Sequence, residues 1–396
     1  MTKTQTLDVL NSLRGVYSCL VFIFHVSGGN TIVSISDPFR EPIIKMGYLS
    51  VDCFFFLSGF VMTHVYEKKF NAAFELKATE EEKRENGLQN NFLRTFLSFF
   101  WNRLVRLYPL IFFSLTIIVV FIRFGEVGWE IMYEYLMISN WVSGFTWWNG
   151  PLWSLEVEFI LYLLFPIFLW INQKINHGKI IWISIISSLI FPFILLAASL
   201  INYAVEGSFP SEFFLFYELY VFGKIFRGVE AFYAGICLYQ VYELKKETKE
   251  IFDYLSLGTL ILNMTIVIYV PYIYLYMYGW YLFTFFLVKS NSFMKYIFEM
   301  KILLFLGEIS FSLYLLHFPL NIYLNDYIDE KYSIKFNVKT KFFIFLGLFS
   351  FLVIYSYLIY KYYELPTREY LRTIWLTIDK KCFEKKLLTE SLRKDG

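Results

Sequence analysis

The sequence has few charged residues, few prolines and few cysteines for its length. Only 18% of its 396 residues are charged, against about 25% in soluble domains, and it contains 10 prolines and 4 cysteines. Cys19, Cys53, Cys237 and Cys382 form no CxxC spacing, so the sequence predicts neither a disulfide framework nor a zinc site. Glycine follows no regular period, which excludes a fibrous chain.

An excess of charge of one sign is also missing. The 36 Lys and Arg residues nearly balance the 34 Asp and Glu residues. The chain therefore lacks the basic character of a nucleic-acid-binding protein, and we expect no nucleic-acid partner. It is instead 57% hydrophobic and 22% aromatic, which excludes a disordered chain. This composition is typical of an all-α polytopic membrane protein.

Long apolar runs recur along the chain. A helix needs about 20 apolar residues to cross roughly 30 Å of hydrocarbon. By this criterion the sequence predicts about ten membrane spans, near residues 8–27, 43–66, 108–124, 151–171, 180–201, 213–240, 252–270, 272–288, 302–324 and 341–362. The stretch 131–148 contains Asn140 and Gly144, and we interpret it as a half-inserted or interfacial segment.

The distribution of Lys and Arg predicts the orientation and the domain organisation. Most Lys and Arg residues of the connecting segments fall on one side if the N-terminus is inside, and cytoplasmic loops carry this excess. Both termini are therefore expected to be cytoplasmic. We expect a transmembrane domain over residues 1–370, with a cytoplasmic loop and interfacial helix at 67–107, and a basic cytoplasmic tail at 371–396. Because Asp8 and Arg14 interrupt the first apolar stretch, we do not expect a cleavable signal.

Two titratable residues share one face of the first predicted span. Ionisable side chains inside a membrane are costly and usually face a cavity or a partner. Arg14 and His25 are separated by close to three helical turns, or about 16 Å along the axis. They could line a passage from the cytoplasm into the bundle. Alternatively, Arg14 reaches the inner headgroups and His25 is hydrogen-bonded inside the bundle.

Acidic residues occur in the second and fourth predicted spans. Asp52 lies beside a run of phenylalanines and is followed by Ser58 and Gly59, so it could form a polar clamp between helices instead of taking part in chemistry. In the fourth span, Glu158 lies on the opposite side of the helix from Glu156. Either glutamate could instead be a structural partner of Arg227 in the sixth span.

Two further pairs of residues lie about one helical turn apart. Arg103 and Arg106 share a helix face, and guanidinium groups bind phosphate with two-pronged hydrogen bonds. They could hold a phosphorylated ligand or contact anionic lipid headgroups. Tyr314 and His317 face a common site in the ninth span, although this histidine could equally be a satisfied interface residue.

Together these motifs resemble the membrane acyltransferase 3 family of bacterial O-acyltransferases. The resemblance rests on six ordered blocks, at residues 10–25, 51–60, 103–109, 153–158, 306–319 and 364–368. It implies transfer of an acyl group, commonly acetyl, from cytosolic acyl-CoA to a hydroxyl of a cell-envelope or secreted carbohydrate, such as a polysaccharide, lipopolysaccharide or lipid-linked glycan. It also implies a multi-pass protein of the bacterial inner membrane, in contact with its lipids. Many relatives carry an esterase-like C-terminal domain, which we do not expect here.

The resemblance also suggests roles for the motif residues. Acetyl-CoA is the expected donor, with no metal, and its phosphates would be bound by Arg14, Arg103 and Arg106. His25 would act as general base or as nucleophile. Glu158 or Asp52 would orient its imidazole, and we favour Glu158. The residues expected on the acceptor side are Tyr314, His317, Trp153 and Ser154.

A different class of function uses the same buried charges. A transporter or flippase would place them along an ion or lipid-linked sugar pathway without acyl chemistry. Such proteins usually contain inverted repeats and paired broken helices, and the sequence shows no internal repeat. The sequence makes no prediction of the oligomeric state.

Overall fold

A computed structural model describes residues 3–29, 40–74, 92–124, 128–143, 146, 148–175, 220–244, 249–269, 273–324 and 338–392. Every regular element within these residues is a helix, which confirms the all-α class for this part of the chain. The predicted span at 180–201 lies outside the described residues, as does the beginning of the span predicted at 213–240.

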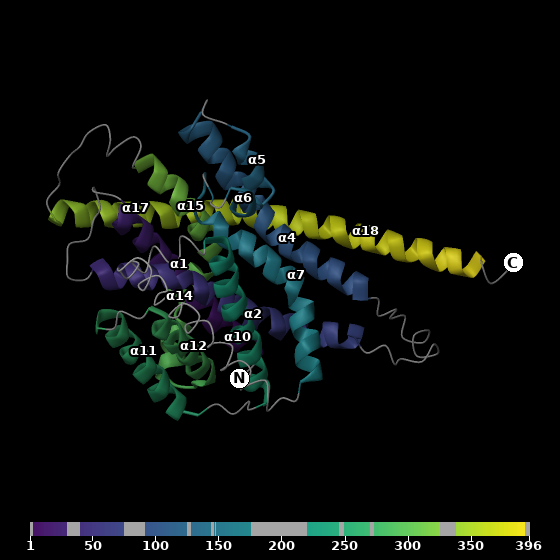
Figure 1. Ribbon diagram of the computed structural model, residues 1–396, viewed down its shortest axis with the longest axis horizontal. Helices are drawn as coiled ribbons and strands as arrows, with labels where there is room; N and C mark the ends of the chain where they lie inside the picture. The colour runs from purple at the N-terminus through teal and green to yellow at the C-terminus, as the bar shows by residue number, and fades with distance from the viewer. Residues whose placement is uncertain are drawn as a thin grey trace, which may run out of the picture.

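The helices follow one another along the chain as follows (Figure 1). They are α1 (Lys3–Gly29), α2 (Arg40–Phe74), α4 (Phe92–Ile117), the π-helical η1 (Ile118–Ile122), α5 (Glu130–Tyr135), α6 (Ser139–Val142), α7 (Leu152–Lys174), α10 (Tyr220–Leu244), α11 (Ile251–Tyr269), α12 (Ile273–Lys289), α13 (Phe293–Phe298), α14 (Lys301–Glu308), α15 (Ser310–Tyr323), α17 (Val338–Ile359), the π-helical η3 (Tyr360–Glu364) and α18 (Leu365–Leu392).

The helix α2 lies at the centre of the bundle and packs against α1, α7 and α10. Its contact with α10 depends on two glycines. A Cβ atom at Gly59 would collide with the carbonyl group of Phe232, and one at Gly235 would collide with the carbonyl group of Phe56. Because small residues let helix backbones approach closely, this pair of glycines fixes the register between α2 and α10.

Among the residues that the structure describes, five helical segments are long and apolar enough to cross a membrane. They are Asp8–Val26, Leu49–Phe74, Phe92–Ile122, Leu152–Lys174 and Lys339–Lys380. The pair α14 and α15, bent by 65° at their junction, would form a sixth span. These segments support a multi-pass membrane protein, whereas the count of ten spans and the cytoplasmic location of the termini stay predictions.

The predicted boundary between an interfacial helix and the third span falls inside one helix. The helix α4 continues through Pro109, and η1 follows it without a break. The predicted start of a separate tail at residue 371 likewise falls inside α18, which continues from α17 and η3 as one rod (Figure 1). The boundaries were predicted where charged residues interrupt an apolar run. Charged side chains lower the hydrophobicity of a segment, but here they do not end the helix.

The rod is held against α4 at several levels. Tyr363 donates a hydrogen bond to the carbonyl oxygen of Pro109 at 3.1 Å. Farther along, the Trp101 indole donates to the carbonyl oxygen of Leu371 at 3.1 Å, and its ring stacks on Trp375 with 5.7 Å between centroids. The beginning of α18 therefore lies beside the helix that carries Arg103 and Arg106.

The described residues of the segment interpreted as half-inserted form two short helices, α5 and α6, and none of these residues lies in a candidate span. Two buried carboxylates hold it in place. Glu134 accepts hydrogen bonds from the backbone N–H groups of Trp148 at 2.7 Å and Asn149 at 3.0 Å, and Glu156 accepts one from the backbone N–H of Asn140 at 2.8 Å. Since buried backbone donors need partners, these acids stabilise an irregular path inside the bundle.

Candidate functional site

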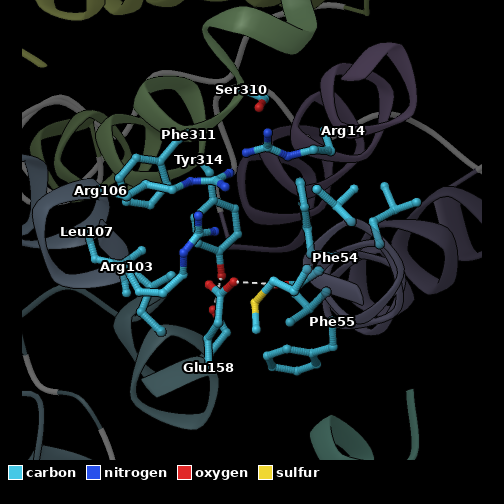
Figure 2. Close-up of a pocket in the computed structure, with 17 residues that line it drawn as sticks. Arg14, Phe54, Phe55, Arg103, Arg106, Leu107, Glu158, Ser310, Phe311 and Tyr314 are labelled. Atoms are coloured by element: carbon cyan, nitrogen blue, oxygen red, sulfur yellow. Dashed lines mark hydrogen bonds between the residues drawn. The ribbon is translucent and has the colours of Figure 1, made fainter. Parts of the chain in front are cut away.

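A cavity of about 80 Å³ lies between α1, α2, α4, α7 and α15. Its lining includes eight polar residues, namely Arg14, Ser58, Arg103, Arg106, Ser154, Glu158, Ser310 and Tyr314. Phenylalanine, methionine and aliphatic side chains from α2, α4, α7 and α15 complete the wall. Figure 2 shows Arg14 entering from α1 on one side and Arg103 and Arg106 entering from α4 on the other.

The cavity carries an excess of positive charge. Three guanidinium groups face it, whereas Glu158 is the only acid among the lining residues. Arg103 donates a hydrogen bond to the Tyr66 hydroxyl at 3.2 Å, and its guanidinium carbon lies 5.4 Å from the centre of the Tyr66 ring. Unmatched charge is costly inside a protein, so this arrangement favours occupation by an anion. The structure thus brings together the three arginines that the sequence analysis grouped.

Glu158 lies among these arginines. It accepts a hydrogen bond from the Ser58 hydroxyl at 2.9 Å, and its charge interacts with those of Arg14, Arg103 and Arg106 (Figure 2). Within the described residues no hydrogen bond joins Glu158 to His25. The structure therefore does not bring together the carboxylate and the imidazole that it was expected to orient.

Asp52 forms a buried ion pair that joins α2 to α10. Arg227 donates from Nε to Oδ1 of Asp52 at 2.9 Å and from Nη2 to Oδ2. The two side chains are 0% and 2% exposed. Neither Glu156 nor Glu158 is the ion-pair partner of Arg227, and Asp52 does not line the cavity. Its position corresponds to the structural alternative, a polar clamp between helices.

His25 lies against His317. The Nδ1 atom of His25 is 3.1 Å from Nε2 of His317 and 3.1 Å from the carbonyl oxygen of Val21. His317 is 0% exposed. In the described part of the chain, no three His, Cys, Asp and Glu side chains are grouped as metal ligands. The sequence analysis named both histidines but did not predict that they form a pair.

Tyr314 connects the cavity to the histidine pair. It lines the cavity, its hydroxyl lies 2.7 Å from the Ser154 hydroxyl, and it donates to the carbonyl oxygen of Pro151 at 3.1 Å. Its ring centre is 6.0 Å from that of His317. His25 itself does not line the cavity. The cavity therefore extends from the arginines to Tyr314, and the two histidines are not part of its lining.

Trp153, which was expected at the acceptor side, contacts two cations. Lys224 and Arg227 lie 5.3 Å and 5.8 Å from the centre of its ring. Lys224 also donates a hydrogen bond to the side chain of Asn140 at 2.7 Å. The indole is thus held by cation–π contacts, and it does not line the cavity.

Glu364 is a buried acid to which the sequence analysis gave no role. Its carboxylate accepts hydrogen bonds from the Ser312 hydroxyl at 2.6 Å and from Arg368 at 3.1 Å. These contacts attach α15 to the junction of η3 and α18. The charge of Glu364 interacts with Arg14, and that of Arg368 interacts with Arg106. The spacing of Glu364 and Arg368, one helical turn apart, was the available signal for their contact.

Comparison with known proteins identifies the family. A family model described as an acyltransferase domain matches residues 7–375. The chain belongs to the membrane acyltransferase 3 family. This membership agrees with the resemblance carried by the six sequence blocks.

The similar curated proteins come from Staphylococcus aureus. Those of strains COL, MSSA476 and MRSA252, whose names assign them provisionally as O-acetyltransferases, are each 24% identical to this chain over 366 residues. The match covers 82% of this chain and 52% of each relative, so the chain spans about half the length of the curated relatives it matches. No solved structure matches the chain.

Proposed function

We propose that the chain is a membrane O-acyltransferase of the bacterial inner membrane. It transfers an acyl group, most commonly acetyl, from cytosolic acyl-CoA to a hydroxyl of a cell-envelope or secreted carbohydrate. The observation that carries this proposal is the cavity with three guanidinium groups and one carboxylate, which is connected through Tyr314 to a pair of histidines. Family membership and the names of the staphylococcal relatives support the same class of reaction.

The arginines suit the anionic part of the donor. Coenzyme A carries several phosphate groups, and a guanidinium group donates two parallel hydrogen bonds to a phosphate. A volume of about 80 Å³ is far smaller than the roughly 300–1,000 Å³ of a typical ligand pocket. The cavity would therefore hold one part of the donor, with Arg14, Arg103 and Arg106 binding phosphate oxygens, while the thioester extends past Tyr314.

His25 would supply the base for the transfer. As general base, it takes the proton of the acceptor hydroxyl while the hydroxyl oxygen forms a bond to the thioester carbonyl carbon. The carbon–sulfur bond then breaks, and the proton passes to the departing thiolate. As nucleophile, His25 instead attacks the thioester carbonyl carbon, the carbon–sulfur bond breaks, and the departing thiolate takes the proton of the imidazolium. The acceptor hydroxyl then attacks the acyl-imidazole, the carbon–nitrogen bond breaks, and the hydroxyl proton passes to the imidazole. The second route would move the acyl group toward an outer acceptor without moving coenzyme A.

The acceptor would bind beyond Tyr314, on the side of α15 and the loop at residues 148–151. Tyr314 and Ser154 are joined by a hydrogen bond, so either hydroxyl could be shared with a sugar hydroxyl. The side chain of Asn149 donates to the carbonyl oxygen of Leu315 at 3.5 Å, which holds this loop against the helix that carries His317. Trp153 lies two residues beyond this loop, and its ring, which also contacts Lys224 and Arg227, would add aromatic surface for a pyranose.

The decisive experiment compares surface glycans of cells that express the wild-type chain, a His25→Ala variant or neither. Mass spectrometry should find glycans heavier by one acyl unit only with the wild type. The variant should insert into the membrane and keep the melting temperature of the wild type in detergent. The side chain that it loses, the His25 imidazole, is small and half-buried. Transport of a substrate without any acyl difference would replace the proposal by the transporter class, and unfolding of the variant would assign His25 a structural role.

A further inference from the structure

The hydrogen-bond partners of His25 limit which of its nitrogens carries a hydrogen. Nδ1 of His25 lies 3.1 Å from the carbonyl oxygen of Val21, one turn earlier on the same helix. A carbonyl oxygen can only accept, so a hydrogen bond to it requires the hydrogen to be on Nδ1. A neutral imidazole with its hydrogen on Nδ1 has its lone pair on Nε2.

His317 completes this arrangement from the opposite helix. Its Nε2 atom lies 3.1 Å from the same Nδ1 atom of His25. Two N–H groups pointing at each other repel, so a hydrogen on His25 Nδ1 requires Nε2 of His317 to be an acceptor. The carbonyl oxygen of Val21 thus selects the tautomer of His25 with its hydrogen on Nδ1, and Nε2 of His317 lies where it can accept the same hydrogen.

The surroundings of the pair strengthen this contact. His317 is 0% exposed, and its neighbours Leu313 and Leu316 pack with Phe22 and Val26 of α1 in one apolar cluster. Hydrogen bonds are electrostatically stronger in such surroundings than in water. If His25 accepts a proton on Nε2, the contact becomes a hydrogen bond from an imidazolium to a neutral nitrogen, which is stronger than a neutral one.

We infer that His317 is a positioning residue, whose Nε2 accepts the Nδ1–H of His25 and leaves Nε2 of His25 as the atom that takes the proton from the acceptor hydroxyl. This inference rests on the proposed acyl transfer and reassigns His317 from the acceptor side. A residue that is fully buried and has Nε2 turned to His25 acts on the reaction through His25 and not through the sugar.

Two variants of the full chain test the inference in an acyl-transfer assay with purified protein, acetyl-CoA and a glycan acceptor. His317→Leu removes the acceptor and should lower kcat by about 100-fold, in the range of general-base effects, with KM for both substrates nearly unchanged. His317→Gln keeps an acceptor oxygen at a similar reach and should recover part of this loss. A wild-type kcat in a folded His317→Leu protein would overturn the inference, as would a rise in acceptor KM alone.

A spectroscopic measurement tests the tautomer without relying on activity. Nitrogen-15 NMR of the histidine-labelled wild-type chain should show His25 protonated at Nδ1 and unprotonated at Nε2. His317→Leu should shift this population toward a mixture of the two tautomers. A wild-type protein with the hydrogen on Nε2 would overturn the inference even if acyl transfer is confirmed. Conversely, the wild-type chain could show the Nδ1–H tautomer but no acyl transfer in cells that express it. That result would reject only the proposed function.

Discussion

Two clusters of buried charge lie in the same bundle, and their charge balance differs. The pair of Asp52 and Arg227 matches one carboxylate with one guanidinium, and the two side chains are 0% and 2% exposed. The cavity places three guanidinium groups around one carboxylate, Glu158. In a matched pair the two charges neutralise each other and hold the helices together. Where cations outnumber carboxylates, the remaining positive charge can bind an anion. This difference separates the structural cluster from the candidate binding site.

The largest expected effect comes from breaking the matched pair. Asp52→Ala leaves the Arg227 guanidinium buried without its carboxylate and should destabilise the fold by about 3–5 kcal/mol. The melting temperature in detergent, followed by a tryptophan fluorescence or light-scattering probe, measures this loss. The double variant Asp52→Leu with Arg227→Met replaces both charges with apolar groups and should recover most of the stability.

This comparison also separates structure from chemistry at Asp52. The double variant should retain acyl transfer in proportion to its folded fraction. A stable double variant without activity would contradict the clamp and return Asp52 or Arg227 to the catalytic machinery.

A smaller effect is expected from removing charge in the unmatched cluster. The double variant Arg103→Ala with Arg106→Ala relieves repulsion among cations, so its melting temperature without ligand should stay close to the wild-type value. Coenzyme A should raise the melting temperature of the wild type but not of this variant, because each lost charge-assisted hydrogen bond weakens binding by about 1.5–3 kcal/mol.

A matched control for these arginines is Lys at both positions. Arg103→Lys with Arg106→Lys keeps the charge but loses the two-pronged geometry, so it should restore only part of the coenzyme A effect. An equal thermal shift in the alanine variant and the wild type would remove phosphate binding from this cluster.

The smallest effect is expected at an exposed matched pair. Arg94 binds Asp379 through two hydrogen bonds of 2.8 Å and 2.7 Å, but the side chains are 43% and 25% exposed. Arg94→Ala should therefore cost no more than about 1 kcal/mol of stability and leave acyl transfer unchanged. A large loss of stability would mean that the contact of α18 with α4 depends on this pair more than on Trp101 and Trp375.

The helices could be predicted from apolar runs, but their ends could not. Residues 92–107 carry enough charge to suggest a surface helix, yet α4 continues through Pro109 into the bundle. The same holds at residue 371, where α18 continues along α4. Hydropathy averages the side-chain polarity of a segment, whereas a helix ends only where its backbone hydrogen bonds stop.

The candidate site was predicted in part. Arg103 and Arg106 share a face through helical spacing alone, and Arg14 joins them in the structure. The sequence offered Glu158 or Asp52 to orient His25, with Glu158 favoured, and Glu156 or Glu158 as a partner of Arg227, because all three acids lie in apolar helices. Only the packing of α2 against α10 selected Asp52 for Arg227.

The sequence by itself determined that the chain is an all-helical membrane protein with a histidine and several arginines placed in apolar segments, since composition and helical period act within each segment. The tertiary structure decided which of these groups meet: Glu158 with the arginines, and His25 with His317. The physical reason is that helical spacing relates residues a few positions apart, whereas contacts between helices depend on register. Here glycines such as Gly59 and Gly235 set that register by letting two backbones touch.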